Sequence, residues 1–360
     1  MNGFFYHIFF RLWFSFGSNK DTEPTVPPLA PLAPLAPLAP LASTTSTTVF
    51  ANQQGCSTML RPALLLTELT DTNLKLAAQC GATDIVGPCP GFQEGDLQTL
   101  VNRIQSFGLR LSVIERFVPH AKIVHDLPGR DEQVENIKTL IRQMGHAGVE
   151  CLCYNWMPSD DWTRTSVDVP VRGGALTTAF DLASTPVAIS GNNKSSAAIT
   201  TREKLWETLE TFLKEVLPVC EEAGVVLALH PDDPPLETLH GQPQICYSVD
   251  QLKKVTELVA SPSNGICFCQ GTFASAGEDI PSGIRALGNS IKFIHFRNVL
   301  CLDLNKPGEK FQETWQDLGG KICLFDLFDI IASFLNISLT YFFFFFNIVY
   351  FWLLNIIFRH

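Results

Sequence analysis

The sequence predicts an α/β fold: a parallel sheet closed into a (β/α)₈ barrel whose last βα unit is replaced. Seven short apolar runs between residues 60 and 299 have the length of buried strands, and stretches with helical spacing separate them. Strands that alternate with helices form parallel sheets covered by helices. No G-x-G-x-x-G sequence follows the first strand, so a dinucleotide-binding fold has no support. Seven units are also too many for half of a doubly wound sheet.

The elements are expected in a regular order. Strands are predicted within residues 60–68, 82–87, 109–117, 149–156, 225–233, 264–273 and 291–299. Helices are predicted within residues 71–81, 96–108, 130–148, 201–224, 248–261 and 278–290. Each helix starts near an Asp, Thr or Ser that can cap its first turn, and several end in Gly.

The two ends of the chain differ from this domain, which we place at residues 59–317. Residues 1–58 join an apolar start to a P-L-A repeat, and proline at every third position favours an extended spacer, so we expect this part to be disordered. Residues 318–360 are strongly apolar, and 337–358 carry no charge over the length of a transmembrane helix. Two interpretations of this tail stay open, a membrane anchor or translated non-coding sequence.

Composition excludes some classes of function. The 36 acidic residues outnumber the 26 basic ones and give a net charge of −10, which argues against a binder of nucleic-acid phosphates. The 11 cysteines include two C-x-C pairs, Cys151/Cys153 and Cys267/Cys269, but no C-x-x-C. This pattern matches neither a disulfide framework nor a structural zinc site, so we expect reduced cysteines in an intracellular enzyme.

Metal-ligand side chains stand at the ends of three successive predicted strands. These are His230, Cys269 and His295. Reactive groups of (β/α)₈ barrels sit at the C-terminal ends of the strands, so the three are expected to converge. Two imidazoles and a thiolate suit a divalent transition metal. Cys269 is preferred because the loop begins after it, although Cys267 has the same strand parity.

At this point the residues resemble a known family. The motifs are L-P-G-R-D at 127–131, C-Y-N-W-M-P at 153–158, D-W-T-R-T at 161–165, H-P-D-D-P-P at 230–235, P-S-N-G-I at 262–266 and H-F-R-N-V at 295–299. Together they resemble the mannonate dehydratase family, which has a xylose-isomerase-like TIM barrel. The resemblance extends from about residue 110 to residue 317.

The resemblance implies a hydro-lyase of glucuronate breakdown that converts D-mannonate to 2-keto-3-deoxy-D-gluconate with Mn²⁺ or Fe²⁺. It implies a cytoplasmic enzyme with no nucleic-acid partner. The homo-oligomeric state stays open, and membrane association depends on the tail. The implied metal ligands are His230, Cys269 and His295. Candidates for substrate contact are Tyr154, Asn155, Arg164, Arg297 and Asn298. Arg164 has a surface salt bridge as its alternative, and Asp232 and Asp233 are expected to orient His230, bind sugar hydroxyls or shape the turn.

One family motif has no counterpart in this sequence. The family's eighth strand ends in Arg-Pro-Asp-His-Gly, whose Asp is a metal ligand and whose His is the catalytic base. The segment after Asp317 contains no such motif. The catalytic pair is therefore unassigned, and we expect little or no dehydratase activity from this chain. Two alternatives are a metal-dependent sugar isomerase or epimerase, and an inactive membrane-tethered relative that binds a sugar acid.

Overall fold

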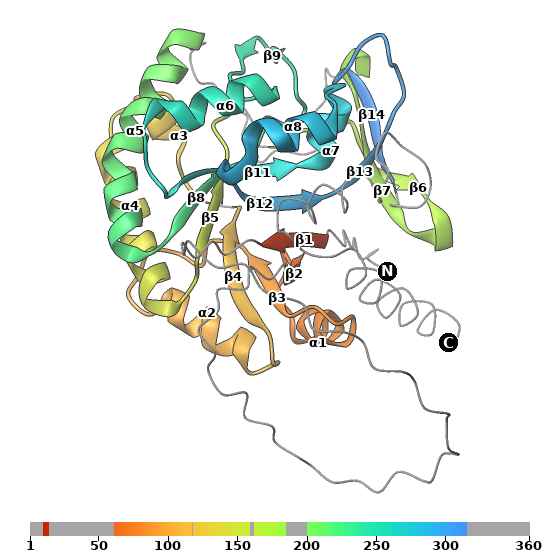
Figure 1. Ribbon diagram of the computed structural model, residues 1–360. Coiled ribbons are helices and arrows are strands. Elements are labelled where there is room, and N and C mark those ends of the chain that lie inside the picture. The colour runs from red at the N-terminus through yellow and green to blue at the C-terminus, as the bar shows by residue number, and fades with distance from the viewer. Residues whose placement is uncertain (1–9, 14–60, 117, 159–161, 185–199, 315–360) are drawn as a thin grey trace, which may run out of the picture. The chain divides into compact units, whose positions relative to one another are not determined.

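Eight strands form a closed barrel in the computed structural model, which describes residues 10–13, 61–116, 118–158, 162–184 and 200–314 (Figure 1). Around the barrel the strands are β1 (Phe10–Trp13), β12 (Ile291–Phe296), β11 (Asn264–Cys269), β8 (Val226–Leu229), β5 (Cys151–Tyr154), β4 (Arg110–Glu115), β3 (Asp84–Gly87) and β2 (Arg61–Leu65). Apart from β1, the seven barrel strands run parallel to one another. The predicted barrel and its seven predicted strands are therefore confirmed.

The eighth position is filled by a segment that the sequence placed in a disordered region. Strand β1 pairs with both β2 and β12 in antiparallel register. The end strands of an open sheet expose unpaired N–H and C=O groups, which are a template for another strand. The four residues 10–13 satisfy these groups. The expectation of disorder is thus wrong for 10–13, while the rest of 1–58 lies outside the described residues.

Helices cover the outside of the barrel (Figure 1). They are α1 (Asp71–Gln79), α2 (Asp96–Gln105), α3 (Ala121–Val124), α4 (Arg130–Ala147), α5 (Arg202–Ala223), α6 (Val249–Leu258), α7 (Gln270–Ser275) and α8 (Ile280–Leu287), with 3₁₀ turns η1 (Arg172–Gly174), η2 (Leu182–Ser184) and η3 (Gly288–Ser290). The side chains of Thr70, Thr201, Ser248 and Asp279 cap α1, α5, α6 and α8 as predicted. Glycines occupy the N-cap of α2 and α4 instead.

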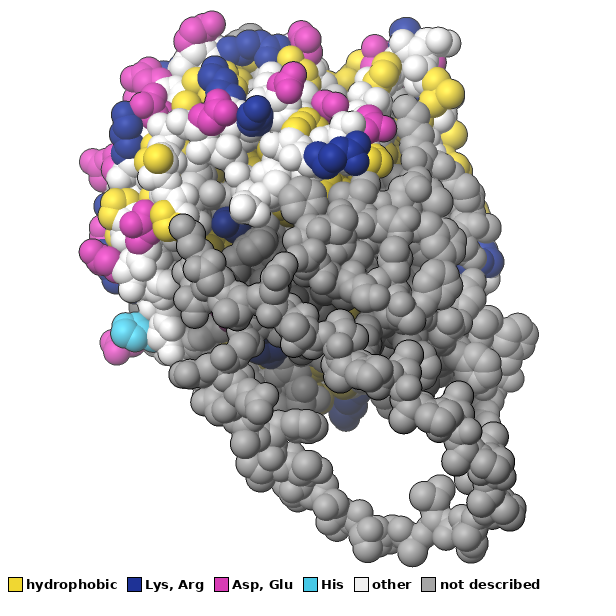
Figure 2. All heavy atoms as spheres, viewed as in Figure 1, with side chains coloured by type: hydrophobic (Ala, Val, Ile, Leu, Met, Phe, Trp, Pro, Cys, Tyr) yellow, Lys and Arg dark blue, Asp and Glu magenta, His cyan; other side chains and the backbone are white. Residues whose placement is uncertain are grey.

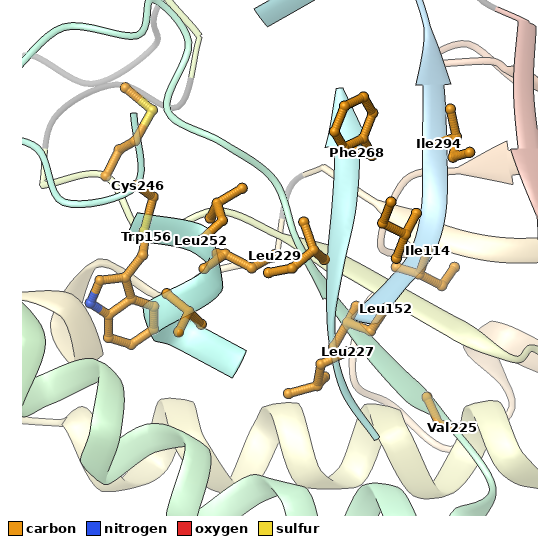
Figure 3. Packing of buried hydrophobic residues seen from close by; sticks show 14 of the residues in the cluster. Ile114, Leu152, Trp156, Val225, Leu227, Leu229, Cys246, Leu252, Phe268 and Ile294 are labelled. Carbon is orange, nitrogen blue, oxygen red and sulfur yellow. The ribbon is translucent and has the colours of Figure 1, made fainter. Parts of the chain in front are cut away.

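Apolar side chains fill both faces of the barrel wall. On β5, Leu152 points outward to the helices (Figure 3), whereas Cys151 and Cys153 point into the barrel. Likewise Phe268 of β11 packs outside while Cys267 packs inside. Each fully buried aliphatic or aromatic side chain contributes about 1.5–3 kcal/mol to folding, so this two-layer core accounts for the continuous apolar character of the strands.

A second sheet, which the sequence did not predict, stands beside the C-terminal ends of the barrel strands. Its order is β13 (Asn298–Cys301), β14 (Lys310–Thr314), β7 (Leu176–Asp181) and β6 (Ser166–Pro170), all antiparallel. A small hairpin of β9 (Thr238–Leu239) and β10 (Gln242–Pro243) follows β8. The four-stranded sheet is built from the insertion after β5 and from the chain after β12, so it brings distant segments to the barrel mouth.

The described surface mixes both signs of charge. Figure 2 shows acidic and basic side chains interspersed over the described part of the face in view. Among the described residues, no helix is both long enough and apolar enough to cross a membrane. The tail at 318–360, with its candidate span at 337–358, lies outside those residues.

Candidate active site

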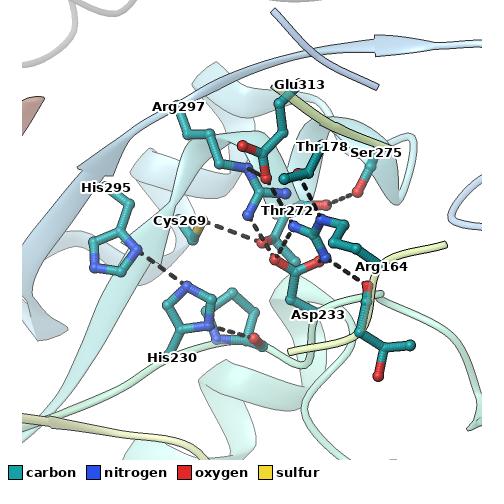
Figure 4. A network of polar contacts seen from close by, with 12 residues as sticks. Arg164, Thr178, His230, Asp233, Cys269, Thr272, Ser275, His295, Arg297 and Glu313 are labelled. Carbon is teal, nitrogen blue, oxygen red and sulfur yellow. Dashed lines mark hydrogen bonds and ion pairs between the residues drawn. The ribbon is translucent and has the colours of Figure 1, made fainter. Parts of the chain in front are cut away.

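Three side chains meet at the C-terminal rim of the barrel, the edge where the parallel strands end (Figure 4). His230 directly follows β8, Cys269 ends β11, and His295 is the penultimate residue of β12. Cys269 and His295 are register partners across the β11–β12 pair. Since β8, β11 and β12 are adjacent and parallel, equivalent positions near their ends reach the same space.

The ligand atoms of His230, Cys269 and His295, which we call the outer set, all lie within 4.8 Å of one another. Nε2 of His230 is 3.1 Å from Nδ1 of His295. Nδ1 of His230 lies 2.6 Å from the carbonyl oxygen of Pro231. A carbonyl oxygen only accepts hydrogen bonds, so Nδ1 carries the proton and Nε2 offers a lone pair toward His295. This donor chemistry fits a divalent transition metal.

The thiol of the outer set is fully buried and held by a neighbour. The hydroxyl of Thr272 in α7 donates a hydrogen bond to Sγ of Cys269 at 3.1 Å. Sequence parity could not separate Cys269 from Cys267. The structure groups Cys269 with His230 and His295, and Cys267 with Cys153 and His295. The choice of Cys269 as the ligand therefore has geometric support but remains a prediction.

Asp233 lies between two buried arginines beside the outer set (Figure 4). Arg164 binds it in bidentate fashion, with Nη1 donating to Oδ1 at 3.0 Å and Nη2 to Oδ2 at 2.9 Å. Arg297 Nη1 donates to Oδ2 at 2.6 Å, and Glu313 accepts from Arg164 Nη2 at 2.8 Å. Burial raises the pKa of Asp233, but the charges of Arg164 and Arg297 outweigh it and hold that pKa below its usual range. Asp233 is therefore ionised at neutral pH.

Arg164 is a packed part of this network. Its side chain is fully buried, its Nε donates to Oγ1 of Thr178 at 3.1 Å, and its guanidinium lies over the rings of Trp162 and Phe311 at 4.7 and 5.1 Å. It is not among the residues that line the cavity found in the described part of the chain. The alternative of a surface salt bridge is wrong because the ion pair is buried. The geometry gives Arg164 the task of holding Asp233, and a direct substrate contact remains only a prediction.

The neighbouring carboxyl, Asp232, has a different environment. The backbone N–H of Cys246 donates to its Oδ2 at 2.7 Å. Burial raises the pKa of Asp232 to about 7, against the opposing effect of the Cys246 hydrogen bond. The pKa of Asp232 is thus raised and that of Asp233 lowered from the usual aspartate value, because, of these two acids, only Asp233 has cationic partners within hydrogen-bonding distance among the described residues.

A cavity opens at this rim. Its lining includes Glu115, Tyr154, Asn155, His230, Asp233, His295 and Arg297. Nη2 of Arg297 and the hydroxyl of Tyr154 are buried and have no hydrogen-bond partner among the described residues. Oδ1 of Asn155 lies 3.1 Å from Nε2 of His120, which orients the amide. Asn298 is not in the lining within the described chain, and its Oδ1 accepts a hydrogen bond from the N–H of Val299 at 3.0 Å.

Two acidic residues of the site were missed in the sequence. Glu115 ends β4, and its Oε2 lies 3.3 Å from Nε2 of His295. Its position at a strand end is the same signal that identified His230, so sequence reasoning could have found it. Glu313 lies in strand β14 of the four-stranded sheet. Only the unpredicted sheet brings Glu313 to the arginines.

Comparisons with known proteins agree on one family. The chain matches the D-mannonate dehydratase (UxuA) family over residues 74–200 and 195–343. This match begins upstream of residue 100 and continues beyond Asp317, so the narrower limits expected from the sequence motifs are corrected. A mannonate dehydratase of Enterococcus faecalis is 33% identical over 269 residues, which cover 65% of this chain and 74% of the relative. A mannonate dehydratase of Streptococcus equi subsp. zooepidemicus is 37% identical over 60% of this chain and 64% of the relative.

Solved structures give the same result. The crystal structure of mannonate dehydratase from Streptococcus suis serotype 2 superposes with a TM-score of 0.64 at 29% identity, over 76% of this chain and 80% of that one. A xylose isomerase-like TIM barrel protein of Mycobacterium smegmatis has a TM-score of 0.50 at 12% identity, over 74% of this chain and 77% of that one, and shows the shared fold alone. Matches over most of the described barrel, with this geometry at its rim, establish the relationship: the chain belongs to the D-mannonate dehydratase family.

Proposed function

We propose that the outer set holds a divalent transition-metal ion at a site that binds D-mannonate and supports its dehydration to 2-keto-3-deoxy-D-gluconate. The observation that carries this proposal is the approach of two imidazoles and a thiol to within 4.8 Å of one another at the barrel rim. The identity of the substrate is taken from the relatives that bear the name mannonate dehydratase. They are matched over about two thirds to three quarters of their length, so the activity of the whole enzyme is part of the proposal.

The donor set restricts the metal. Imidazole and thiolate ligands favour transition metals over Mg²⁺, and Mn²⁺ or Fe²⁺ is the ion that we propose. A cation bound here would polarise substrate oxygens and stabilise the negative charge that develops when the proton next to the carboxylate is removed. His230 is prepared for this role because its Nδ1 hydrogen bond to Pro231 leaves Nε2 as the ligand atom.

Arg297 is the residue that we propose for the substrate carboxylate. It lines the cavity, and its Nη1 is held by Asp233 at 2.6 Å while Nη2 has no hydrogen-bond partner within the described chain. A guanidinium that is held at one nitrogen can donate hydrogen bonds from another nitrogen to a carboxylate, and the side chain loses little further entropy on binding. Burial lowers the pKa of Arg297, but Asp233, Cys269 and Glu313 more than offset this and raise it, so the positive charge persists.

Tyr154 and Asn155 are proposed to bind substrate hydroxyls. The Tyr154 hydroxyl is buried among apolar rings, including Phe212 at 5.7 Å between centroids. Burial raises its pKa well above the ordinary value, so it stays protonated and can donate a hydrogen bond.

The base for the substrate proton is unassigned, because the Arg-Pro-Asp-His-Gly sequence does not occur in this chain. Loss of a general base lowers a rate by about 10²–10⁴-fold, and we expect turnover lower by that factor.

The test combines metal binding with product analysis. Metal-free protein is titrated calorimetrically with Mn²⁺, as wild type and as the H230A, C269A, H295A and H146A variants; His146 is an exposed control near the end of α4. We expect one Mn²⁺ per chain, bound at least about tenfold more weakly by each outer-set variant and unchanged in H146A. Equal Mn²⁺ affinity of the wild type and all four variants would contradict the proposed metal site at the outer set.

Product analysis addresses the reaction itself. D-mannonate is incubated with the Mn²⁺-loaded protein at high enzyme concentration. A 2-keto-3-deoxy acid supports the dehydratase, whereas a ketose supports the isomerase alternative.

A further inference from the structure

Two cysteines lie inside the barrel directly below the outer set. Cys153 of β5 and Cys267 of β11, which we call the inner pair, belong to the interior cluster of the barrel and are buried. Their sulfur atoms and a ring nitrogen of His295 all lie within 4.8 Å of one another. Each cysteine is one member of a C-x-C pair, in which the two thiols point to the same face of the strand.

The register shows how the inner pair relates to the rim. Cys269 is paired with His295 across β11 and β12, and Cys267 is paired with Phe293. Two residues of a strand span about 6–7 Å, so Cys267 lies one side-chain layer deeper than Cys269. Cys153 reaches this layer from β5, which is separated from β11 by the single strand β8. His295 offers a ring nitrogen within 4.8 Å of the other ligand atoms of the outer set and of the sulfur atoms of the inner pair.

We propose that Cys153, Cys267 and His295, which we call the inner set, form a second metal site that shares His295 with the outer set and takes a soft, thiophilic cation such as Zn²⁺. The inner set offers two thiolates and one imidazole, and this composition favours Zn²⁺ over Mn²⁺, which prefers oxygen ligands. The outer set offers one thiolate and two imidazoles. The inner set therefore has the stronger preference for a thiophilic ion.

An entry route and an additional oxygen ligand are present. Cys153 lines the rim cavity together with Glu115 and His295, so an ion that enters the cavity meets Cys153. Oε2 of Glu115 lies 3.3 Å from Nε2 of His295, on the same side of the barrel as Cys153, its register partner across β4 and β5. The Glu115 carboxylate can complete a four-ligand shell around the inner ion.

Sharing of His295 couples the two sites. One ring nitrogen binds one ion, so an inner ion on that nitrogen removes His295 from the outer set. If the ions use different ring nitrogens, the ring must release its N–H proton to solvent and bridge them as an imidazolate, and the two dications repel each other across it. In either arrangement Zn²⁺ at the inner set weakens binding at the outer set, and the reverse holds by linkage.

The experiment counts the thiolates around a bound ion in the full chain. Metal-free protein is loaded with Co²⁺, whose near-ultraviolet thiolate charge-transfer band grows with the number of coordinated thiolates, and Zn²⁺ is then added to displace it. The variants are C153A, C267A and C269A, with C220A as control, since Cys220 is a buried thiol of α5 in the outer layer. Circular dichroism of each metal-free variant checks folding, and Cys-to-Ser forms replace any Ala variant that does not fold.

We expect C153A and C267A each to lower the band by about half, while C269A and C220A keep a two-thiolate band. Zn²⁺ should abolish the band in wild type at one equivalent. A band lost only in C269A, or unaffected by both inner-pair variants, would overturn the proposal. One folded inner-pair variant suffices, because each removes one of the two thiolates.

A second readout tests the coupling. One equivalent of Zn²⁺, placed at the inner pair by the cobalt displacement, should weaken Mn²⁺ binding at least about tenfold in wild type. Unchanged Mn²⁺ affinity in the zinc-loaded wild type would overturn the coupling. Absence of Mn²⁺ binding would contradict the proposed metal site at the outer set. The cobalt spectrum would still test the second metal site, because it counts the thiolates of the inner pair.

Discussion

Nη1 of Arg297 donates to Oδ2 of Asp233 at 2.6 Å, and the same carboxylate is held from its other side by the two terminal nitrogens of Arg164. One buried anion thus fixes two buried cations from segments more than a hundred residues apart in sequence. Asp233 links the small sheet, the loop after β8 and the end of β12 into one rigid wall of the cavity (Figure 4).

Replacing Asp233 is expected to destabilise the fold. D233N leaves two buried guanidinium groups without their anion, and breaking a buried pair by removal of one partner costs about 3–5 kcal/mol. The free energy of unfolding from urea titration measures this loss. D131N is the matched control, because the Asp131 side chain is 95% exposed in its pair with Arg130 and an exposed pair contributes little. Equal stability of D233N and D131N would contradict the role given to Asp233.

Asp232 gives the protein a distinct pH dependence. Its folded-state pKa is about 7, whereas a carboxyl of an unfolded chain has a pKa of about 3.9. Between these values the folded protein retains a proton that the unfolded chain has released. The stability contributed by this group is therefore full below about pH 4 and is lost as pH rises to 7, by on the order of 4 kcal/mol.

Comparing urea unfolding of wild type and D232N between pH 4 and pH 7 isolates this effect. We expect wild type to lose more stability than D232N over the interval. Parallel pH profiles for the two proteins would show that Asp232 does not titrate abnormally.

The two arginines are expected to respond differently to the same substitution. R297K keeps the charge but loses the second nitrogen that faces the cavity, so D-mannonate should bind at least about tenfold more weakly while the fold persists. R164K loses the bidentate contact with Asp233 and should lower stability with a smaller effect on substrate affinity. Calorimetric titration with D-mannonate and urea unfolding of both variants give the two quantities. Weaker substrate binding confined to R164K would reverse the assignment.

Strand β1 closes the barrel, so its disruption should expose two edges. Leu12 pairs with Ile294 on one side and Pro62 on the other. L12P removes an N–H group and fixes φ within the strand, which frees the edges of β2 and β12 for pairing with other chains. Light scattering after size-exclusion chromatography should show more oligomer than in wild type. L35P, in the proline repeat, is the control, and a monodisperse L12P equal to L35P would contradict the closure.

Much of the fold could be predicted because local and global signals agree. The strand formed by residues 264–269 and the helix formed by 280–287 each carry their period and their turn residues in a short window. The metal-ligand candidates could also be predicted, because strand ends in a parallel barrel share a rim. His230, Cys269 and His295 required only the strand order to be placed together.

What could not be predicted depends on contacts between distant segments. The ion pair of Arg164 with Glu313 joins the loop before β6 to strand β14, and the two residues are 149 positions apart in the sequence. Strand β1 comes from a segment with no helical or turn signal that would assign it to the barrel. The role of Arg164 follows from its burial, which no local pattern encodes.

The central claim is that His230, Cys269 and His295 share one divalent ion. Anomalous diffraction at the manganese edge from crystals of the full chain grown with Mn²⁺ tests it most directly. One strong peak within bonding distance of both imidazoles and the thiolate is the predicted result. A peak bonded to other side chains, or none at the barrel rim in a well-ordered crystal, would contradict the account.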